Sequence, residues 1–398
     1  MRIGIDGSCL SNRRGFGRFA RRLLHALAEQ CSAHDFVVFV DQPSAENVLV
    51  PLDFLRVIVP VREAPTKAAS AQGRRRWRDM FAMGLAVARS RIDLMYFPAT
   101  YSFFPVWNVP KLVVTMHDTL PFSNPELVFP GGKGRLAWRL KETAAARWAD
   151  RIVTVSEASK KALQAWSGWP DSRIRVITEG PDPIFCPRPD DPDAGATLGR
   201  YGISPDARYL LYVGGLSPHK NLLRLVDAFA QAAEHDTLLV LAGDVNDVFH
   251  THVPQIRAAI AQHGLQDRVI LTGFVPDDDL VFLYSRAVAL VLPSLMEGFG
   301  LPAVEAMACG TPVVSSRAGS LPEVVGDAGV YFEPTDVSSI AAAIESLLND
   351  QGRRESLARR AVQQAAFFTW DASARALLAC FDELAPKPND RSTVARSA

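Results

Sequence analysis

The sequence predicts an α/β protein with two doubly wound domains in tandem, and three observations lead to this fold class. The chain has 398 residues, of which 48% are hydrophobic, which is enough for two or three packed domains. Short β-branched runs alternate with amphipathic helical stretches, a pattern typical of βαβ units around a parallel sheet. A segment rich in proline, aspartate and glycine interrupts this alternation near the middle of the chain, after which it starts again.

The first half, residues 1–185, is predicted to form the N-terminal domain. Its helix at 15–30 carries an apolar stripe at three- and four-residue spacing, with arginines largely off that stripe. The expected strands are short and mostly bounded by turn residues, at 2–6, 36–40, 56–59, 94–97, 112–116, 152–155 and 174–177. Ligands of doubly wound sheets bind beyond the carboxyl ends of the strands, so we expect a binding edge there.

Residues 186–208 are predicted to be a linker, because proline lacks an N–H group and fixes φ. The second domain is expected at 209–368, with strands at 209–213, 238–242, 269–271, 289–292, 312–314 and 329–332. Its predicted helices include 222–234, 302–308, 337–348 and 353–368. Residues 369–386 are expected to form a C-terminal helix that packs back on the N-terminal domain. The polar tail 387–398 is expected to be disordered.

Composition and charge exclude several classes of protein. Basic and acidic residues number 43 each, which argues against a nucleic-acid partner. Residues 1–185 hold 26 basic and 17 acidic residues, so this half carries +9 and the remainder −9. The asymmetry indicates two units that face different partners, unless surface charge segregated by chance. Five scattered cysteines without a CxxC pair, and no apolar leader or spanning run, favour a cytoplasmic protein.

The segment GGLSPHKN follows the strand predicted at 209–213 and opens a helix. A glycine-containing turn, here with Gly215, lets the backbone approach a ligand, and a helix N-terminus favours an anion. Lys220 adds a full positive charge at this point. These features outline a diphosphate site, although the P-loop pattern GxxxxGK[ST] is absent, and a solvated lysine is the simpler alternative.

The string EGFGLPAVE follows the strand predicted at 289–292. Glu297 precedes a GFG turn that can expose backbone amides, and Pro302 suits the first turn of a helix. Glu305 lies eight residues after Glu297, within that helix. Two carboxylates that point into one crevice accept hydrogen bonds from hydroxyls, so we expect a sugar or ribose ligand. Taken singly, Glu297 can be a solvated loop residue, and Glu305 can simply favour a helix N-terminus.

The segments GGLSPHKN, TGFVPDDDL, EGFGLPAVEAMACGTPVV and GSLPEVVGDAGVYFEP together resemble glycosyltransferase family 4. GFGR at 15–18, TMHDTLPF around His117 and VSEASKKAL from Val155 extend the resemblance over most of the chain, in the family's order. Glu297 and Glu305 match the family's E-x7-E motif. The resemblance implies the GT-B fold, in which two Rossmann-like doubly wound α/β domains face each other across a cleft. Residues 1–185 would bind the acceptor, and residues 209–368 the nucleotide sugar.

The resemblance also implies a role for each matching residue. Glu305 is expected to bind the ribose hydroxyls of the donor, and Glu297 the hydroxyls of the donor sugar. Lys220 is expected to neutralise the departing diphosphate, and His117 to point at the donor sugar near the reacting centre. The other expected donor contacts are Gly215, Gly298, Phe299, Gly300 and Leu301 along the sugar and diphosphate, Val275 at the base, and Gly15 and Gly17 at the phosphates.

The sequence departs from the family pattern at one point. Many members carry an arginine four or five residues before the lysine, where this chain has Gly214, Gly215 and Leu216. One of the two cations that clamp the diphosphate is therefore missing. Either Lys220, backbone amides and the helix dipole compensate, or a basic residue such as Arg18 helps from the opposite domain.

No metal and no other cofactor is expected, because the family acts without a metal and takes the nucleotide sugar as co-substrate. DPD at 191–193 and DDD at 277–279 match the DxD metal pattern formally. The first lies in the predicted linker and the second resembles a helix N-terminus. The family retains the anomeric configuration and is thought to use front-face attack, in which the diphosphate helps to deprotonate the acceptor. No carboxylate stands out as a nucleophile for double displacement.

A basic cluster lies before a predicted apolar helix: Arg74, Arg75, Arg76, Trp77 and Arg78. Basic residues around a tryptophan suit an anionic membrane surface. The alternative is a solvated helix start whose apolar stripe faces the core. Membrane contact agrees with the +9 charge of this half, so we expect a cytoplasmic protein, peripheral on the inner face of the membrane.

The leading hypothesis is a metal-independent, retaining hexosyltransferase that extends a glycan or lipid-linked glycan. GDP-mannose is the favoured donor, because GSLPEVVGDAG looks most like bacterial mannosyl- and rhamnosyltransferases of cell-surface polysaccharide biosynthesis. The alternatives are a nucleotide-sugar epimerase or hydrolase of the same fold, and a non-catalytic nucleotide-sugar-binding protein. A Rossmann dehydrogenase is disfavoured because the G-x-G-x-x-G fingerprint is absent.

Overall fold

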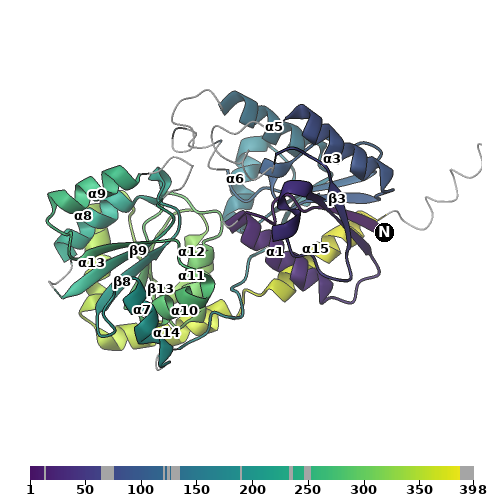
Figure 1. The fold of residues 1–398 in the computed structure, drawn as a ribbon. Helices are drawn as coiled ribbons and strands as arrows, with labels where there is room; N and C mark the ends of the chain where they lie inside the picture. The colour runs from purple at the N-terminus through teal and green to yellow at the C-terminus, as the bar shows by residue number, and fades with distance from the viewer. Residues whose placement is uncertain are drawn as a thin grey trace, which may run out of the picture.

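The computed structural model describes residues 1–12, 15–63, 76–119, 122, 126, 135–188, 191–232, 236–245 and 252–385. Two α/β domains lie beside each other, each built around one parallel sheet (Figure 1). The predicted fold class of two doubly wound domains is therefore confirmed. The predicted strands are confirmed as well, and their ends differ by one or two residues.

The N-terminal sheet has the strand order β3-β2-β1-β4-β5-β6-β7, with every pair parallel. Its strands are β1 (Arg2–Asp6), β2 (Asp35–Asp41), β3 (Leu55–Val59), β4 (Leu94–Phe97), β5 (Lys111–Thr115), β6 (Arg151–Thr154) and β7 (Ile174–Val176). The helices α1 (Gly15–Ala28), α3 (Trp77–Arg89), α5 (Arg135–Trp148) and α6 (Glu157–Ser167) connect them, with the 3-10 turns η1 (Gln42–Asn47), η2 (Thr100–Ser102) and η4 (Asp171–Arg173). Side chains of α1 pack in one hydrophobic cluster, and those of α3, α5 and α6 in another, so both faces of the sheet are covered.

The C-terminal sheet has the order β10-β9-β8-β11-β12-β13, again all parallel. Its strands are β8 (Arg208–Val213), β9 (Thr237–Ala242), β10 (Val269–Gly273), β11 (Ala289–Leu292), β12 (Val313–Ser316) and β13 (Gly329–Phe332). Helices α8 (Leu222–Ala232), α9 (Val253–Gln262) and α13 (Val337–Leu348) lie on one face. Helices α10 (Asp277–Arg286), α11 (Leu301–Ala308), α12 (Leu321–Val325) and α14 (Gln351–Ala365) lie on the other (Figure 1).

Short polar side chains explain where several helices begin. The N-cap oxygens of Ser156, Asp336, Asp350 and Thr369 accept hydrogen bonds from backbone N–H groups two or three residues further on. The interiors of the central strands are mostly apolar and buried, and β4 and β11 each have four buried residues in succession. Continuous apolar strands are what a parallel sheet requires when helices cover both of its faces.

The predicted linker contains a helix, which corrects the expectation that its prolines exclude one. Helix α7 (Asp193–Arg200) lies within residues 186–208 and packs against α10. It forms because Pro192 stands at the N-cap, where a missing N–H costs nothing, and no proline occurs from 193 to 200. Arg200 and Tyr201 then bind Asp279 on α10, which fixes the segment to the C-terminal domain.

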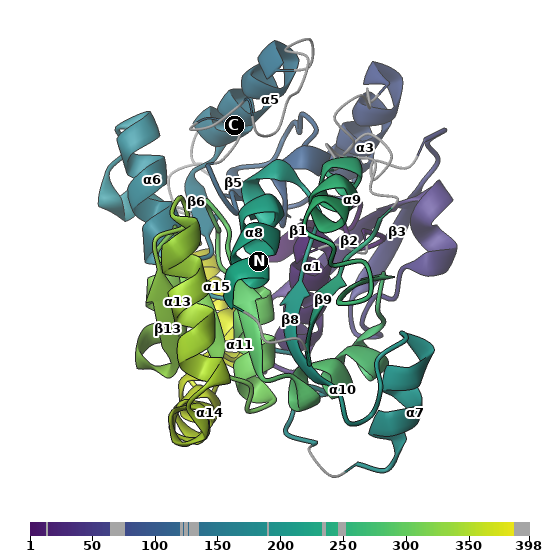
Figure 2. The same cartoon turned by 90° about the vertical axis from the view of Figure 1, so that its left-hand side faces the viewer.

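The chain crosses between the domains twice, and the two crossings lie side by side. Helix α15 (Trp370–Glu383) follows the C-terminal domain in sequence but packs against α1 of the N-terminal domain (Figures 1 and 2). The Ser373 hydroxyl donates a 2.6 Å hydrogen bond to the carbonyl of Thr178 in the first crossing. A Cβ at Gly180 would lie 2.9 Å from the backbone nitrogen of Trp370, so the contact requires glycine. Residues 386–398, which include the predicted disordered tail, lie outside the described residues.

Among the described helices, none combines the length and the apolar character needed to cross a bilayer.

Candidate active site

The candidate site lies where the strand order of the C-terminal sheet reverses. β8 and β11 are neighbours, and the chain proceeds outward from them in opposite directions, through β9 to β10 and through β12 to β13. Ligands of doubly wound sheets bind at such a switch point, beyond the carboxyl ends of the strands. The loops after these two strands carry Lys220 and Glu297, so both predicted motifs meet at one edge.

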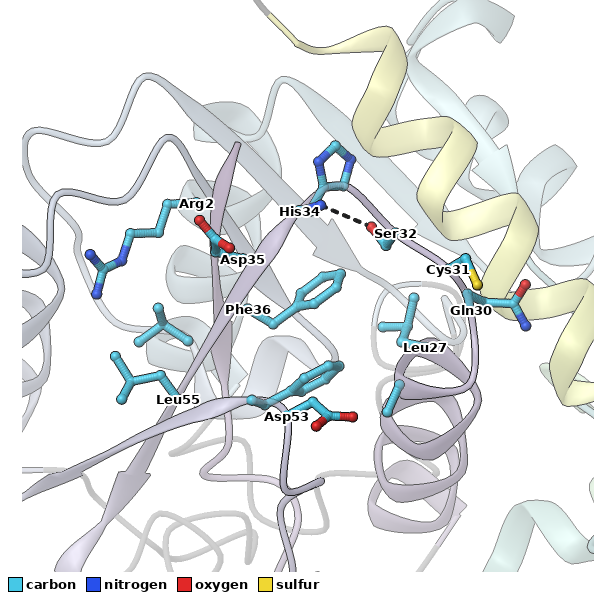
Figure 3. A pocket seen from close by; sticks show the side chains of 13 residues that line it. Arg2, Leu27, Gln30, Cys31, Ser32, His34, Asp35, Phe36, Asp53 and Leu55 are labelled. Atoms are coloured by element: carbon cyan, nitrogen blue, oxygen red, sulfur yellow. Dashed lines mark hydrogen bonds between the residues drawn. The ribbon is translucent and has the colours of Figure 1, made fainter.

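A separate cavity of about 490 Å³ opens at the opposite edge of the N-terminal sheet (Figure 3). Its lining includes Arg2, Asp35 and Leu55, the first residues of β1, β2 and β3. These are the amino ends of the strands, away from the edge where this class of sheet binds ligands. The cavity therefore does not belong to the candidate site.

Lys220 and Glu297 form a largely buried ion pair, with 2.6 Å between Nζ and Oε1. Ser294 donates a second hydrogen bond of 3.0 Å to the same carboxylate oxygen. Burial on its own would raise the pKa of Glu297, but Lys220 and these hydrogen bonds outweigh burial and hold the pKa below its ordinary value. Glu297 is therefore an ionised hydrogen-bond acceptor, and Lys220 is its ion-pair partner.

Asn221 fixes the position of Lys220, and sequence reasoning missed this role. Its backbone is left-handed, with φ of 60°. Its buried amide donates to the carbonyls of Pro293 and Pro334, at 3.0 and 2.7 Å. Asparagine tolerates this conformation better than most residues, which is the signal that the HKN string offered.

The turn at 298–300 leads into α11 without a side-chain cap. Gly300 is the N-cap, with φ of 96°, a conformation that favours glycine. Ser320 holds the turn from behind by donating to the carbonyl of Phe299 at 2.7 Å. Pro302 has no N–H, and the N–H of Ala303 donates to the carbonyl of Gly300 at 2.8 Å, so α11 offers an anion the N–H of Leu301 and the partial positive charge of the helix start.

Glu305 lies one turn into α11 and is 1% exposed. The Tyr284 hydroxyl donates a 3.0 Å hydrogen bond to Oε2, and Arg18 forms an ion pair through Oε1. Burial raises the pKa of Glu305, and the charge of Arg18 opposes this shift without cancelling it. The carboxyl that is expected to bind ribose is thus already held by two partners.

Arg18 crosses from α1 of the N-terminal domain to the C-terminal domain. Its guanidinium binds Glu305 and also Asp277 in the first turn of α10. Burial would lower the pKa of Arg18, but these two carboxylates raise it, so the side chain stays charged. The sequence named Arg18 as a possible source of the missing cation. The structure places its guanidinium against Glu305 and Asp277, and a contact with the diphosphate stays a prediction.

His117 lies at the end of β5 with its ring among N-terminal residues. Nε2 lies 2.9 Å from the carbonyl of Pro98, and Nδ1 lies 3.7 Å from a carboxylate oxygen of Glu179. The rings of Phe16 and Phe19 pack edge-on against it. The expected contact with a donor sugar stays a prediction for this residue.

The remaining predicted donor contacts have different surroundings. Tyr212 donates to the carbonyl of Gly215 at 2.6 Å, and Val275 is buried between β10 and α10. A Cβ at Gly15 would meet open space, whereas one at Gly17 would lie 1.8 Å from the carbonyl of Asn12. Gly17 is thus required by the packing of its own domain, whether or not it also approaches a phosphate.

The described residues contain no group of three His, Cys, Asp or Glu side chains that could hold a metal ion. Of the DDD segment, Asp277 binds Arg18 and Asp279 binds Arg200 and Tyr201.

The predicted membrane cluster is described in part. Arg74 and Arg75 lie outside the described residues, while Arg76, Trp77 and Arg78 form the exposed start of α3. Trp77 is 68% exposed, and Arg78 lies over its ring at 5.4 Å. Phe81, one turn further along α3, is 52% exposed and packs against the ring of Trp107.

Two facing doubly wound domains, with a cation and two carboxylates at the switch point of the second, define a transferase of the GT-B class. Residues 197–364 match the family described as glycosyl transferases group 1, and residues 13–185 match the one described as Glycosyltransferase Family 4. The chain therefore belongs to glycosyltransferase family 4, and the resemblance in the sequence is confirmed.

Relatives and solved structures agree with this assignment. The chain is 30% identical to O-antigen chain mannosyltransferase B of Escherichia coli, over 90% of this chain and 93% of the relative. It is 27% identical to the serotype-specific mannosyltransferase WbdA of Escherichia coli, over 93% of this chain but 46% of that protein. The sucrose-phosphate synthase of Thermosynechococcus elongatus has the same fold, with a TM-score of 0.77 and 22% identity over 96% of this chain and 99% of the other. Anabaena Alr3699/HepE in complex with UDP-glucose aligns with a TM-score of 0.72 and 20% identity, over 97% and 100%.

Proposed function

We propose that this glycosyltransferase moves a mannosyl residue from GDP-mannose to a glycan or lipid-linked glycan in cell-surface polysaccharide biosynthesis, with retention of configuration. The observation that carries the proposal is the largely buried Lys220–Glu297 pair at the switch point of the C-terminal sheet, with the buried Glu305 on the helix that follows. The identity to an O-antigen mannosyltransferase over nearly the whole of both chains supports mannose as the sugar.

The chemistry follows from where charge develops. The bond between the anomeric carbon and the diphosphate breaks, and the diphosphate gains negative charge as the carbon becomes oxocarbenium-like. Lys220 and the start of α11, with the N–H of Leu301 and the helix dipole, are the groups that would stabilise this charge. The acceptor oxygen bonds to the anomeric carbon while its proton passes to the departing diphosphate, which yields the glycoside and GDP.

Glu297 would bind the sugar rather than attack it. Its Oε1 already accepts bonds from Lys220 and Ser294, and an ionised carboxylate can accept further bonds from sugar hydroxyls. Because side chains and backbone dipoles supply the positive charge, we expect transfer without a divalent cation. Glu305 would hold the ribose, and the segment around Val275 the base.

Binding and transfer are tested in turn. Thermal-shift measurements with GDP, UDP, dTDP and ADP, each with and without EDTA, should give a shift for GDP that EDTA leaves unchanged, because a ligand of the native state raises the melting temperature. GDP-[14C]mannose with a lipid extract as acceptor should then give labelled product. A shift with UDP or dTDP alone would exclude GDP-mannose, and release of free mannose without acceptor would favour hydrolysis.

We also propose that the start of α3 contacts an anionic membrane surface, which would bring the enzyme to a lipid-linked acceptor. Trp77 and Phe81 are exposed on adjacent turns, and Arg76 and Arg78 flank the tryptophan. An amphipathic indole beside basic side chains suits the headgroup region of a bilayer.

Flotation with vesicles of phosphatidylglycerol and phosphatidylcholine tests the membrane proposal. Trp77→Ala should reduce binding several-fold, and 0.5 M salt should reduce it further. Phe367→Ala, which removes an exposed aromatic from the C-terminal domain, is the control and should bind like the parent protein. Absence of binding by the parent protein would overturn the proposal.

A further inference from the structure

The start of α6 is capped from the opposite domain. The first four N–H groups of a helix have no partner within the helix. In α6, the N-cap Ser156 accepts from Ser159, and the next two N–H groups toward the N-terminus, those of Glu157 and Ala158, donate to Glu323 at 3.0 and 3.1 Å. Glu323 belongs to α12 of the C-terminal domain, so one carboxylate caps two of these four N–H groups from across the interface.

The same stretch of chain that carries Glu323 also contacts the turn at 297–300, which is proposed to bind the donor and is called the donor turn below. Ser320 donates to the carbonyls of Phe299 and Glu297, at 2.7 and 3.3 Å. A Cβ at Gly319 would lie 2.2 Å from the carbonyl oxygen of Glu297, so only glycine permits this approach. Residues 319–323 therefore touch the turn at 297–300 at one end and α6 of the other domain at the other end.

The turn also contacts the N-terminal domain directly. Ser156 and Ser159 both donate to the carbonyl of Gly298, at 2.6 and 3.1 Å. A Cβ at Gly298 would lie 2.5 Å from the carbonyl oxygen of His117, so the two domains meet here at backbone distance. The donor turn is thus held on one side by residues 319–320 and on the other by the start of α6.

We propose that Glu323 is a positioning residue for glycosyl transfer. Its carboxylate binds the positive end of α6 across the interface between the domains. This contact holds the turn at 297–300 in the conformation that binds the donor. Glu323 touches no reacting group, because its two oxygens are taken up by the backbone of α6. The inference rests on the proposed transferase activity, because the turn at 297–300 is proposed to bind the nucleotide-sugar donor.

Hydrogen–deuterium exchange tests the contact without any activity measurement. The amides of Glu157 and Ala158 have no acceptor within α6, so their protection reports Glu323 alone. In the parent protein, with or without a saturating nucleoside diphosphate, these amides should exchange slowly. In Glu323→Ala they should exchange at least tenfold faster, while the interior amides of α6 stay protected.

Two further variants keep the test decisive. Glu323→Gln retains the shape and one acceptor oxygen without the charge, so it should give intermediate exchange even if the alanine variant folds poorly. Glu345→Ala removes an exposed glutamate from α13 and should leave both exchange and kinetics unchanged. Fast exchange of both amides in the parent protein under all conditions, or exchange that Glu323→Ala does not alter, would overturn the proposal.

Kinetics separate positioning from mere stability. We express kcat per mole of nucleotide-binding sites, so that unfolded protein is not counted. On this basis Glu323→Ala should lower kcat about tenfold, while the Kd for the nucleoside diphosphate changes less than about twofold. A loss of kcat that vanishes after this correction for active sites would mean a structural role only. If no variant or parent protein transfers sugar, the proposed function fails, and the exchange result still decides whether Glu323 forms the interdomain contact.

Discussion

Arg18 of the N-terminal domain and Glu305 of the C-terminal domain form an ion pair across the interface between the domains. Glu305 is the carboxylate that the family motif assigns to the donor ribose, and it is 1% exposed. A ribose that binds Glu305 must share it with Arg18 or displace the guanidinium. A displaced Arg18 would lie next to the donor with its charge unpaired on that side, and the nearest new anion would be the diphosphate.

Arg18→Gln should weaken binding of the nucleoside diphosphate about 10- to 100-fold, the range expected for a lost charge-assisted contact. Binding of the corresponding nucleoside should change little, and Arg18→Lys should fall between, because lysine keeps the charge without the planar fork. Calorimetric titration measures both ligands. Arg22→Gln is the control, because Arg22 binds Asp182 instead. Tighter diphosphate binding by Arg18→Gln would show that Arg18 only competes for Glu305.

Glu305→Gln should remove the preference for ribose over deoxyribose. In the parent protein, the nucleoside diphosphate should bind about tenfold more tightly than its 2′-deoxy form, since a hydrogen bond to a charged group contributes about 1.5–3 kcal/mol. The variant should bind both forms equally, because its amide is a weaker acceptor and is shared with Tyr284. A preserved preference would place the ribose elsewhere.

Lys220→Ala should lower kcat about 10²- to 10³-fold, as expected when one group that stabilises the departing charge is removed. It also leaves the buried Glu297 without its cation, so a lower melting temperature should accompany the loss. Lys220→Arg should recover part of the rate, and Lys111→Ala, an exposed lysine paired with Asp150, should behave like the parent. A rate close to that of the parent would mean that other groups hold the diphosphate.

Glu142 of α5 should make folding stability depend on pH. Burial raises the pKa of this carboxyl to about 7 from an ordinary 4.5, and its Oε1 has no hydrogen-bond partner among the described residues. The folded state therefore binds the proton more tightly than the unfolded state, so stability falls as pH rises from 4.5 to about 7.

Glu142→Gln should remove this penalty and raise the free energy of unfolding at pH 8 by up to about 3 kcal/mol, with little change near pH 4.5. Urea denaturation at both pH values measures the difference. Glu345→Gln, in an exposed position, should give no change at either pH. Equal stabilisation by Glu142→Gln at both pH values would point to packing rather than to the proton.

The sequence predicted the features that depend on residues close together in the chain. Strands such as β1 and β11 were located to the residue, because a short apolar or alternating segment between turn residues has few other solutions. Lys220 and Glu297 were each predicted to follow a strand, and the structure makes those two strands neighbours, so both residues lie at one edge of the sheet. Helix α7 was missed because proline content was averaged over a segment in which residues 193–200 have none.

Contacts between the domains could not be predicted from the sequence in this way. Nothing in the string GSLPE shows that Glu323 caps a helix that begins 166 residues earlier in the chain. Arg18 could be suggested from a missing cation, but its two carboxylate partners depend on how the domains meet. Such contacts depend on how the two domains pack against each other, which no local periodicity encodes.

The return of α15 to α1 has a practical consequence for engineered hybrids. A chimera that joins the first half of this chain to the second half of another enzyme, cut only near residue 185, would pair α1 with a foreign helix. The contact between the rings of Phe19 and Trp370, whose centroids lie 6.0 Å apart, would then be lost. The N-terminal unit is thus discontinuous in sequence, and a graft that preserves its packing has to carry residues 370–385 along with residues 1–185.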